Sequence, residues 1–120
     1  MSIGHVSSAA LMLSGLAAVV APKRVAAALQ LSPISSRGSA ETRAGLGGTY
    51  AALGAVALAS RDPAFQAAVG VTWLGAAASR LAALVLDRPQ TDAAYWAYLA
   101  AEIGFGAAAL ADTTKRPRCS

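Results

Sequence analysis

The chain has 120 residues, which suffice for one domain and leave no room for a second independent core. Charged residues make up 13% of the chain and its mean hydropathy is +0.50, whereas soluble domains carry about 25% charged residues, so the composition favours a membrane protein. The net charge of +4 resides mainly in predicted loops and ends without interleaved aromatic residues, which argues against a nucleic-acid-binding surface.

The first predicted element is a helix over residues 3–22. This segment contains no Lys, Arg, Asp or Glu, and at about 1.5 Å per residue its length matches a hydrocarbon core about 30 Å thick. Because no basic residue precedes it, we interpret it as a retained membrane helix rather than a signal peptide. His5, at the edge of this helix, is interpreted as an interfacial residue.

A loop and a second membrane helix are predicted next. Pro22 ends the first helix, and after one or two turns along the membrane surface the segment 32–40, dense in Ser, Pro and Gly, predicts a loop. The second helix is predicted over 41–60, with Ser39 as its cap and the Glu41 carboxylate at the positive end of its dipole.

Two further membrane helices are predicted over residues 64–86 and 93–111, each interrupted by one charge, Arg80 in the former and Glu102 in the latter. A polar tail, 112–120, completes the chain. Because short polar connections join the last three helices, we predict an all-α fold of one domain spanning the whole chain. Its architecture is predicted to be an up-and-down transmembrane four-helix bundle.

Small residues recur at helical spacing in the second predicted span. In lipid, dispersion rather than hydrophobicity drives helix association, and small residues let two backbones approach closely. We therefore predict that this helix packs through Gly47, Gly48, Ala51, Gly54 and Ala55.

The predicted topology also gathers polar residues at one end of the bundle, where the second helix starts, the third ends and the fourth starts. A charge at a helix centre costs about 2.5 to 3.5 kcal/mol on insertion, and each Leu, Ile or Phe offsets only about 0.3 to 0.6 kcal/mol. The Glu102 carboxylate therefore needs a partner, and we expect it to couple to Arg80. The candidate polar cluster consists of Glu41, Arg43, Tyr50, Arg80 and Glu102.

Two interpretations of this cluster remain open. In the first, an ion pair between Arg80 and Glu102 is structural and fixes the register of the helices. In the second, the cluster lines a polar pocket that binds a headgroup or another small polar ligand, or relays protons, because ionisable groups inside membranes often mark functional paths.

No motif in the chain indicates an enzyme. The single histidine, His5, has no carboxylate close to it in sequence, so neither a histidine-based triad nor a multi-histidine metal site is predicted. Cys119 is the single cysteine, which excludes an intrachain disulfide and a cysteine metal cluster. The glycines of residues 43–48 follow no predicted strand and lack the Lys and Ser/Thr of a phosphate-binding loop. We predict no enzymatic activity, no cofactor and no metal.

The resulting prediction is a multi-pass protein of the cell membrane that acts as a non-enzymatic accessory or partner-binding bundle. Its expected partners are the lipid bilayer and either a second copy of the chain or another membrane protein, and no nucleic acid. One alternative is a small transporter or ligand-binding membrane protein with a polar pocket around Arg80 and Glu102. The other is a soluble helical interaction module, because 32 alanines would also suit helices in water.

The order of these motifs resembles a bacterial family of small four-helix integral membrane proteins classed as a domain of unknown function. The resemblance covers roughly residues 5 to 112, and its most recognisable part is the E-x-R-x-x-x-G-G segment, in which Leu46 stands where the family commonly has an aromatic residue. It implies four spans and a membrane location, and it implies no activity. The matching residues are Glu41, Arg43, Gly47, Gly48, Gly54, Arg80 and Glu102.

Overall fold

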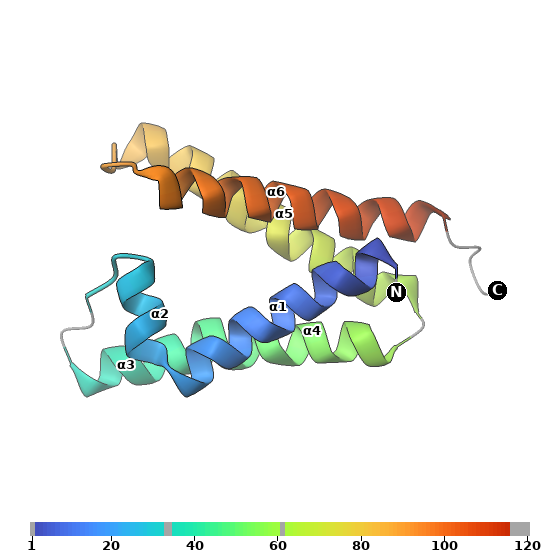
Figure 1. Ribbon diagram of the computed structural model, residues 1–120, viewed down its shortest axis with the longest axis horizontal. Helices are drawn as coiled ribbons and strands as arrows, with labels where there is room; N and C mark the ends of the chain where they lie inside the picture. The colour runs from blue at the N-terminus through green and yellow to red at the C-terminus, as the bar shows by residue number, and fades with distance from the viewer. Residues whose placement is uncertain (1, 33–34, 61, 116–120) are drawn as a thin grey trace. The chain divides into compact units, whose positions relative to one another are not determined.

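The structure is a computed structural model that describes residues 2–32, 35–60 and 62–115, with side chains described to residue 113. Within these ranges helices are the only regular elements, which confirms the predicted all-α fold (Figure 1). The chain divides into two compact units. Met1–Ser7 and Asp62–Ser120 form one, here called the hairpin unit, and Ser8–Arg61 forms the other, here called the α4 unit.

The α4 unit contains most of α1 and then four consecutive helical segments. Pro22 occupies the first turn of α2, where its missing N–H costs no hydrogen bond, so the chain breaks at Ala21 and a new helix starts at once. From α3 onward the backbone stays right-handed helical across both junctions, so three segments form one continuous rod (Figure 1). The segments are α1 (Ile3–Val20), α2 (Pro22–Ala28), α3 (Ser36–Thr42), η1 (Arg43–Gly48) and α4 (Thr49–Ala59).

This rod starts earlier than the sequence predicts. Ser35 is extended, and its side chain accepts a hydrogen bond from the Gly38 N–H at 3.1 Å, which satisfies one of the free amide groups at the start of a helix. The predicted cap, Ser39, lies inside α3 instead, and the predicted loop 32–40 is wrong from Ser36 onward. The serine-rich segment thus supplies a cap as well as a connection.

The middle of the rod, η1, is a π-helix, a wider turn in which each amide bonds one residue further back than in an α-helix. Its sequence, RAGLGG, contains three glycines, which favour a regular α-helix less than any residue except proline. The π-helix therefore lies where the α-helix is intrinsically weakest. It adds one residue to the turn and so changes which side chains of α3 and α4 share a face.

Glycines bring α1 and the rod into backbone contact within the α4 unit. A methyl group placed on Gly15 would fall on the backbone of Gly47, Tyr50 and Ala51, and one placed on Gly54 would lie 2.5 Å from the Met12 nitrogen. Chain order along these contacts is opposite in the two helices, so they pack antiparallel. Only residues without a side chain permit an approach this close.

The predicted packing residues divide between two sides of the rod. Gly47 and Gly54 are buried against α1, and Ala51 is half-buried beside Gly15. Gly48 and Ala55, however, are exposed, and a methyl group on Gly48 would meet nothing within 4 Å among the described residues. The contact face follows spacings of four and three residues, so positions one residue further along are turned away by about 100°.

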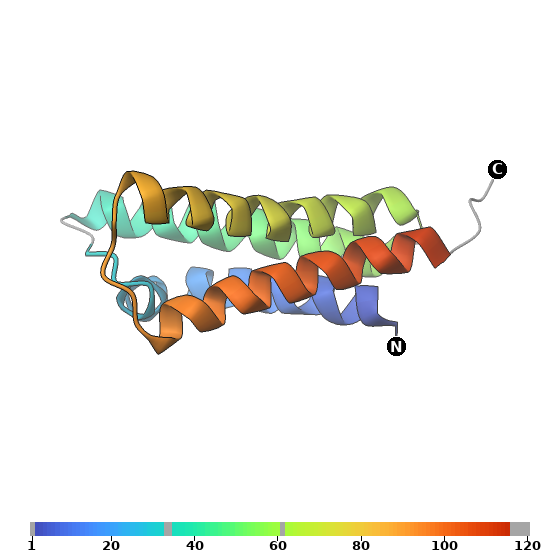
Figure 2. The same cartoon turned by 90° about the horizontal axis from the view of Figure 1, so that it is seen from above.

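The hairpin unit is built on α5 (Pro63–Leu86) and α6 (Ala93–Lys115), which lie side by side (Figures 1 and 2). The Asp62 carboxylate caps α5 by accepting a hydrogen bond from the Ala64 N–H at 2.9 Å, and Pro63 takes the first helical position. Helix α6 continues past residue 111, so the predicted tail 112–120 is helical as far as Lys115. Residues 116–120, which include Cys119, lie outside the described residues.

The two long helices of the hairpin unit contact each other through a reciprocal glycine pair. A methyl group on Gly70 would meet the side chain of Leu110, and one on Gly106 would meet the side chain of Leu74, at 2.7 Å in both cases. Each glycine therefore provides the space that a leucine of the other helix fills. The start of α1 joins this unit, where the Ser7 hydroxyl donates to the Phe105 carbonyl at 2.7 Å.

Two helices of the described residues, α1 and α5, are long and apolar enough to cross a membrane, with mean hydropathies of 1.7 and 1.6. The buried core helix of a soluble protein would pass the same test. Of the 18-residue apolar windows of these helices, 33% is buried in α1 and 22% in α5.

Candidate functional site

An ion pair between Arg80 and Glu102 lies inside the hairpin unit, as the sequence predicts. The Arg80 Nη2 donates to Glu102 Oε1 at 2.6 Å, and Nε lies 3.1 Å and 3.2 Å from the two carboxylate oxygens. The side chains are 24% and 8% exposed, respectively. Two adjacent donors of one guanidinium therefore hold both oxygens of a nearly buried carboxylate, which is a geometrically specific form of pairing.

Helix geometry positions this pair without help from loops. Arg80 lies near the end of α5 and Glu102 lies near the middle of α6, and the two helices run in opposite directions from a short turn. Asp92 accepts a hydrogen bond from the Tyr95 N–H at 2.9 Å and so holds the first turn of α6. Arg80 is closer to the turn than Glu102 is, and the long arginine side chain spans this distance.

Two tyrosines surround the arginine. The Tyr95 hydroxyl donates to the Arg80 carbonyl oxygen at 2.9 Å, and its ring centroid lies 5.2 Å from the guanidinium carbon. The Tyr98 ring lies 5.7 Å from the same carbon. Aromatic faces attract a cation at this range, so the guanidinium is held by a carboxylate in one direction and by aromatic rings in others. The arrangement pairs two opposite charges within the hairpin unit.

The other three predicted cluster residues belong to the α4 unit. The Arg43 Nη1 donates to the Val19 carbonyl at 2.7 Å, where it satisfies a free carbonyl in the last turn of α1. Glu41 is exposed on α3, and Tyr50 is half-buried on α4. The structure therefore brings together Arg80 and Glu102, and the larger cluster of five residues stays a prediction.

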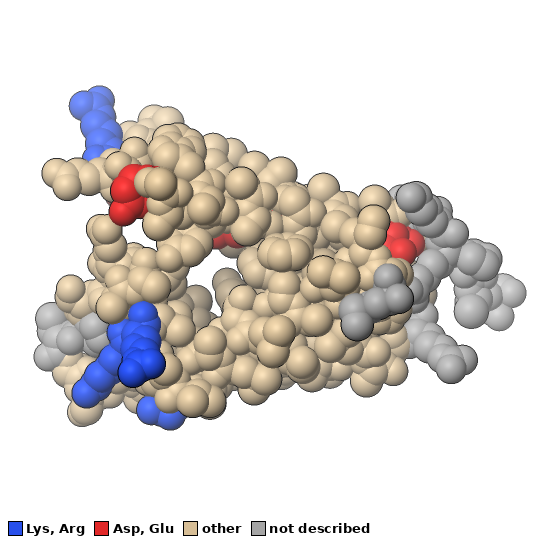
Figure 3. Space-filling model, in the orientation of Figure 1, with Lys and Arg blue, Asp and Glu red and all other residues tan. Residues whose placement is uncertain are grey.

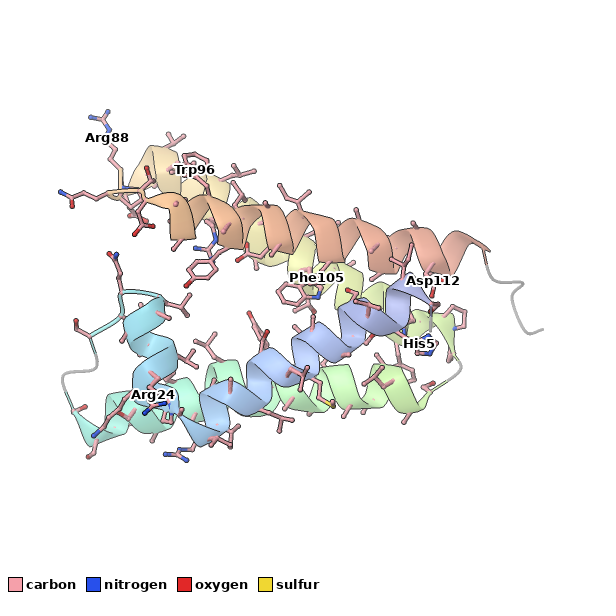
Figure 4. All side chains as sticks on the ribbon, in the orientation of Figure 1. His5, Arg24, Arg88, Trp96, Phe105 and Asp112 are labelled. Carbon is pink, nitrogen blue, oxygen red and sulfur yellow. The ribbon has the colours of Figure 1, made fainter. Side chains whose placement is uncertain are left out.

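A second polar cluster, which the sequence analysis missed, lies at the opposite end of the hairpin unit (Figure 4). The Ser2 hydroxyl contacts His5 Nδ1 and donates to Asp112 Oδ2 at 3.1 Å. A methyl group on Gly4 would collide with the Asp112 carboxylate and would lie 2.8 Å from the side-chain oxygen of Gln66, which is 1% exposed. Side chains of α5 and α6 thus converge on a glycine of α1.

Sequence proximity could not reveal this second cluster, because His5 and Asp112 lie near opposite ends of the chain. Topology could have done so, since an up-and-down arrangement places the start of the first helix beside the end of the fourth. In the structure the cluster fastens the first turn of α1 to α6. Among residues 2–32, 35–60 and 62–113, no group of three or more His, Cys, Asp or Glu side chains gathers in metal-binding geometry.

An apolar groove of about 310 Å³ lies between the first turns of α1 and the middle of α6. Phe105 lies along this groove, and its ring lies 5.3 Å from that of Trp73, centroid to centroid. Binding sites for small polar molecules carry a few placed polar groups that orient the ligand, and this lining contains none on its side chains. The lining residues are Ile3, Val6, Ala101, Gly104, Phe105 and Ala108.

Replacing Tyr95 with phenylalanine should lower the stability of the purified chain by about 1 kcal/mol, the usual contribution of a hydrogen bond. The ring and its contact with the guanidinium remain, and only the hydroxyl that donates to the Arg80 carbonyl is lost. Thermal unfolding measures the change. Tyr50→Phe is the matched control, because no hydrogen bond of its hydroxyl is found among the described residues, and equal losses in the two variants would contradict the assigned contact.

No curated protein and no solved structure matches this chain. A family model, described as a domain of unknown function (DUF4345), matches residues 3–111, which include α5, most of α6 and both residues of the ion pair. This match covers nearly the whole chain, and the chain therefore belongs to the DUF4345 family.

Proposed function

We propose that this chain is an integral membrane protein that acts as a non-enzymatic accessory or partner-binding bundle, with the Arg80–Glu102 pair as its internal structural fastening. The observation that carries the proposal is the exposed apolar surface of the hairpin unit together with polar side chains in its interior. Gln66 and Glu102 are buried there beside Val69, Trp73 and Leu99, while other large apolar residues, among them Val71, Val85 and Leu86, are exposed.

Helix α5 shows both features. Gln66 is 1% exposed, whereas Val85 and Leu86, in the last turn of the same helix, are 77% and 79% exposed. In water this would leave a large apolar area exposed, and each Å² left exposed forgoes about 25 cal/mol of stabilising free energy. In a bilayer the same arrangement is favourable, because lipid tails cover the aliphatic side chains and polar groups find partners inside the protein.

The ion pair supports the same proposal. Each charge by itself would cost about 2.5 to 3.5 kcal/mol at a helix centre, and pairing with close hydrogen bonds removes much of that cost. Soluble proteins leave most charged side chains on the surface and bury them chiefly when they are paired. Here the carboxylate of Glu102 is buried on α6, and every charged group of the pair is directed at the other.

Helix lengths favour four crossings. Helices α1, α5 and α6 contain 18, 24 and 23 residues, and the segments of the α3–η1–α4 rod contain 7, 6 and 11. At about 1.5 Å per residue, all four are long enough for a hydrocarbon core about 30 Å thick, if the shorter α1 is accommodated by its flanking residues.

Three hydroxyl groups support the proposed lack of enzymatic activity, whereas the Ser2 hydroxyl, which contacts His5 and Asp112, is an exception. Ser7 donates to the Phe105 carbonyl, and Ser14 and Thr72 donate to carbonyls four residues earlier in their own helices. These hydroxyls are engaged with backbone acceptors rather than with a neighbouring base, which a nucleophile would require.

Membranes from cells that express the chain should retain it after alkaline carbonate extraction, because helices that cross the bilayer are not released by charge repulsion. Immunoblotting of pellet and supernatant measures this, with one peripheral and one integral protein as markers. Release of the chain together with the peripheral marker would overturn the membrane proposal.

The number of crossings is tested by reporters inserted at two sites, the segment 32–40 and the turn 87–92. Four crossings place both reporters on the same side of the membrane. If only α1 and α5 cross, the two reporters lie on opposite sides, and the four-span arrangement is wrong.

A further inference from the structure

Four basic side chains are exposed at the end of the α4 unit where α1 stops. Lys23 and Arg24 lie on α2, Arg37 lies on α3, and Arg43 starts η1. Figure 3 shows blue side chains gathered over the region of α2 and α3, and Figure 4 labels Arg24 there. We call these four residues the basic patch.

The charges of the basic patch are not neutralised within the described residues. No ion pair links any of the four to a carboxylate there, and Arg43 uses one nitrogen to hold the uncharged Val19 carbonyl. Glu41 is the single acidic residue of segment 21–60, so four basic residues stand against one acidic residue. The patch therefore keeps an excess of three positive charges.

The basic patch also lies at a defined place along an apolar helix. The Arg43 side chain bonds the last turn of α1, whose final residue, Val20, is 78% exposed. Helix α2 then turns Pro22 and Ala26 inward, while its two basic residues face outward. If α1 crosses the membrane as proposed above, the basic patch lies at the level of the lipid headgroups.

We infer that the basic patch binds the phosphates of anionic phospholipid headgroups. A guanidinium offers paired N–H donors that match phosphate oxygens, and a lysine ammonium adds a point charge. Basic clusters beside a membrane helix gain from the negative surface potential of anionic lipids. The inference rests on the proposed membrane function and adds the class of ligand and the residues that hold it.

The turn between α5 and α6 shows that a basic residue near a helix end does not by itself make such a patch. Arg88 is exposed there (Figure 4), but Asp87 and Asp92 flank it in the same turn. This turn carries an excess of negative charge and should not select anionic lipids. Arg88 therefore provides a control that changes the same charge at a site of opposite local sign.

The full chain, reconstituted into nanodiscs of equal phosphatidylglycerol and phosphatidylcholine, should retain phosphatidylglycerol preferentially when released into native mass spectrometry. A basic residue near the surface contributes an electrostatic attraction that corresponds to about a fivefold preference. We expect Arg24→Gln to reduce the preference about fivefold and Lys23→Gln/Arg24→Gln to reduce it further, while Arg88→Gln leaves it unchanged. Lys23 and Arg24 are both exposed, so we expect the variants to remain folded, which thermal unfolding checks.

Equal retention of the two lipids by the native chain, or equal effects of Arg24→Gln and Arg88→Gln, would overturn the inference and favour a soluble acidic partner or none. Failure of the membrane proposal gives a different result. A chain that carbonate releases, but that floats with phosphatidylglycerol vesicles and not with phosphatidylcholine vesicles, would overturn the proposed membrane crossing and keep the headgroup site.

Discussion

Arg80→Leu and Glu102→Leu should each lower the stability of the detergent-solubilised chain by about 3 to 5 kcal/mol, because each change leaves the opposite charge buried without its partner. The effect is large here because the Glu102 side chain is 8% exposed and its three hydrogen bonds among the described residues all come from the Arg80 guanidinium. The double variant should recover much of the loss, because two apolar side chains of similar size need no partner. Thermal unfolding of the four proteins measures the coupling.

The control for this cycle is Arg88→Leu, which removes an exposed charge from a turn and should change stability by less than about 0.5 kcal/mol. Additive losses in the double variant would show that the two charges are not coupled. The same cycle separates the two interpretations of the pair. If the stable double variant rescues a deletion strain, the pair is structural. If the deletion phenotype persists, the pair belongs to a functional site.

Gly54→Ala should destabilise the α4 unit by about 1 to 3 kcal/mol, the typical cost of overpacking, although alanine is the better helix former. The added methyl would lie 2.5 Å from the Met12 nitrogen and 2.7 Å from the Ser8 carbonyl oxygen. Both are backbone atoms, which cannot turn aside as a flexible side chain would, so α1 and α4 must separate. Gly15→Ala should have the same effect from the other helix.

The matched control, Gly75→Ala, is expected to change the stability in the opposite direction. Gly75 lies inside α5 and is exposed, and a methyl group there would meet nothing within 4 Å among the described residues. Gly75→Ala should therefore stabilise the chain by about 0.4 to 1 kcal/mol through helix propensity. Thermal unfolding compares the three variants, and a stabilising Gly54→Ala would show that α1 and α4 are not in backbone contact.

The ion pair could be predicted from the sequence because two arguments converge on it. Insertion energetics required a partner for Glu102, and the depth of each residue in its helix left Arg80 within reach. Neither argument needs side-chain detail. The contacts of the two tyrosines with Arg80 could not be predicted from the sequence, because they depend on the direction in which each ring points from the start of α6.

The packing face of the rod shows why the rest was harder. Small residues occupy so many positions that sequence spacing could not separate Gly54, which lies against α1, from Ala55, which does not. The π-helix added a further difficulty, since it shifts the register ahead of α4. The start of the rod was misplaced because Ser35 and Ser39 are equally good caps by residue type, and only the extended backbone of Ser35 decides between them.

The π-helix η1 also separates two tasks along one rod. Downstream of it, α4 packs against α1 through glycines, and these close backbone contacts do not allow α4 to rotate. Upstream of it, α3 carries the exposed Arg37. One residue more or fewer in this wide turn would rotate α3 by about 100° relative to α4. An insertion or deletion upstream of Gly47 would therefore re-aim Arg37 on α3, while the contacts of Gly47, Ala51 and Gly54 with α1 stay in place.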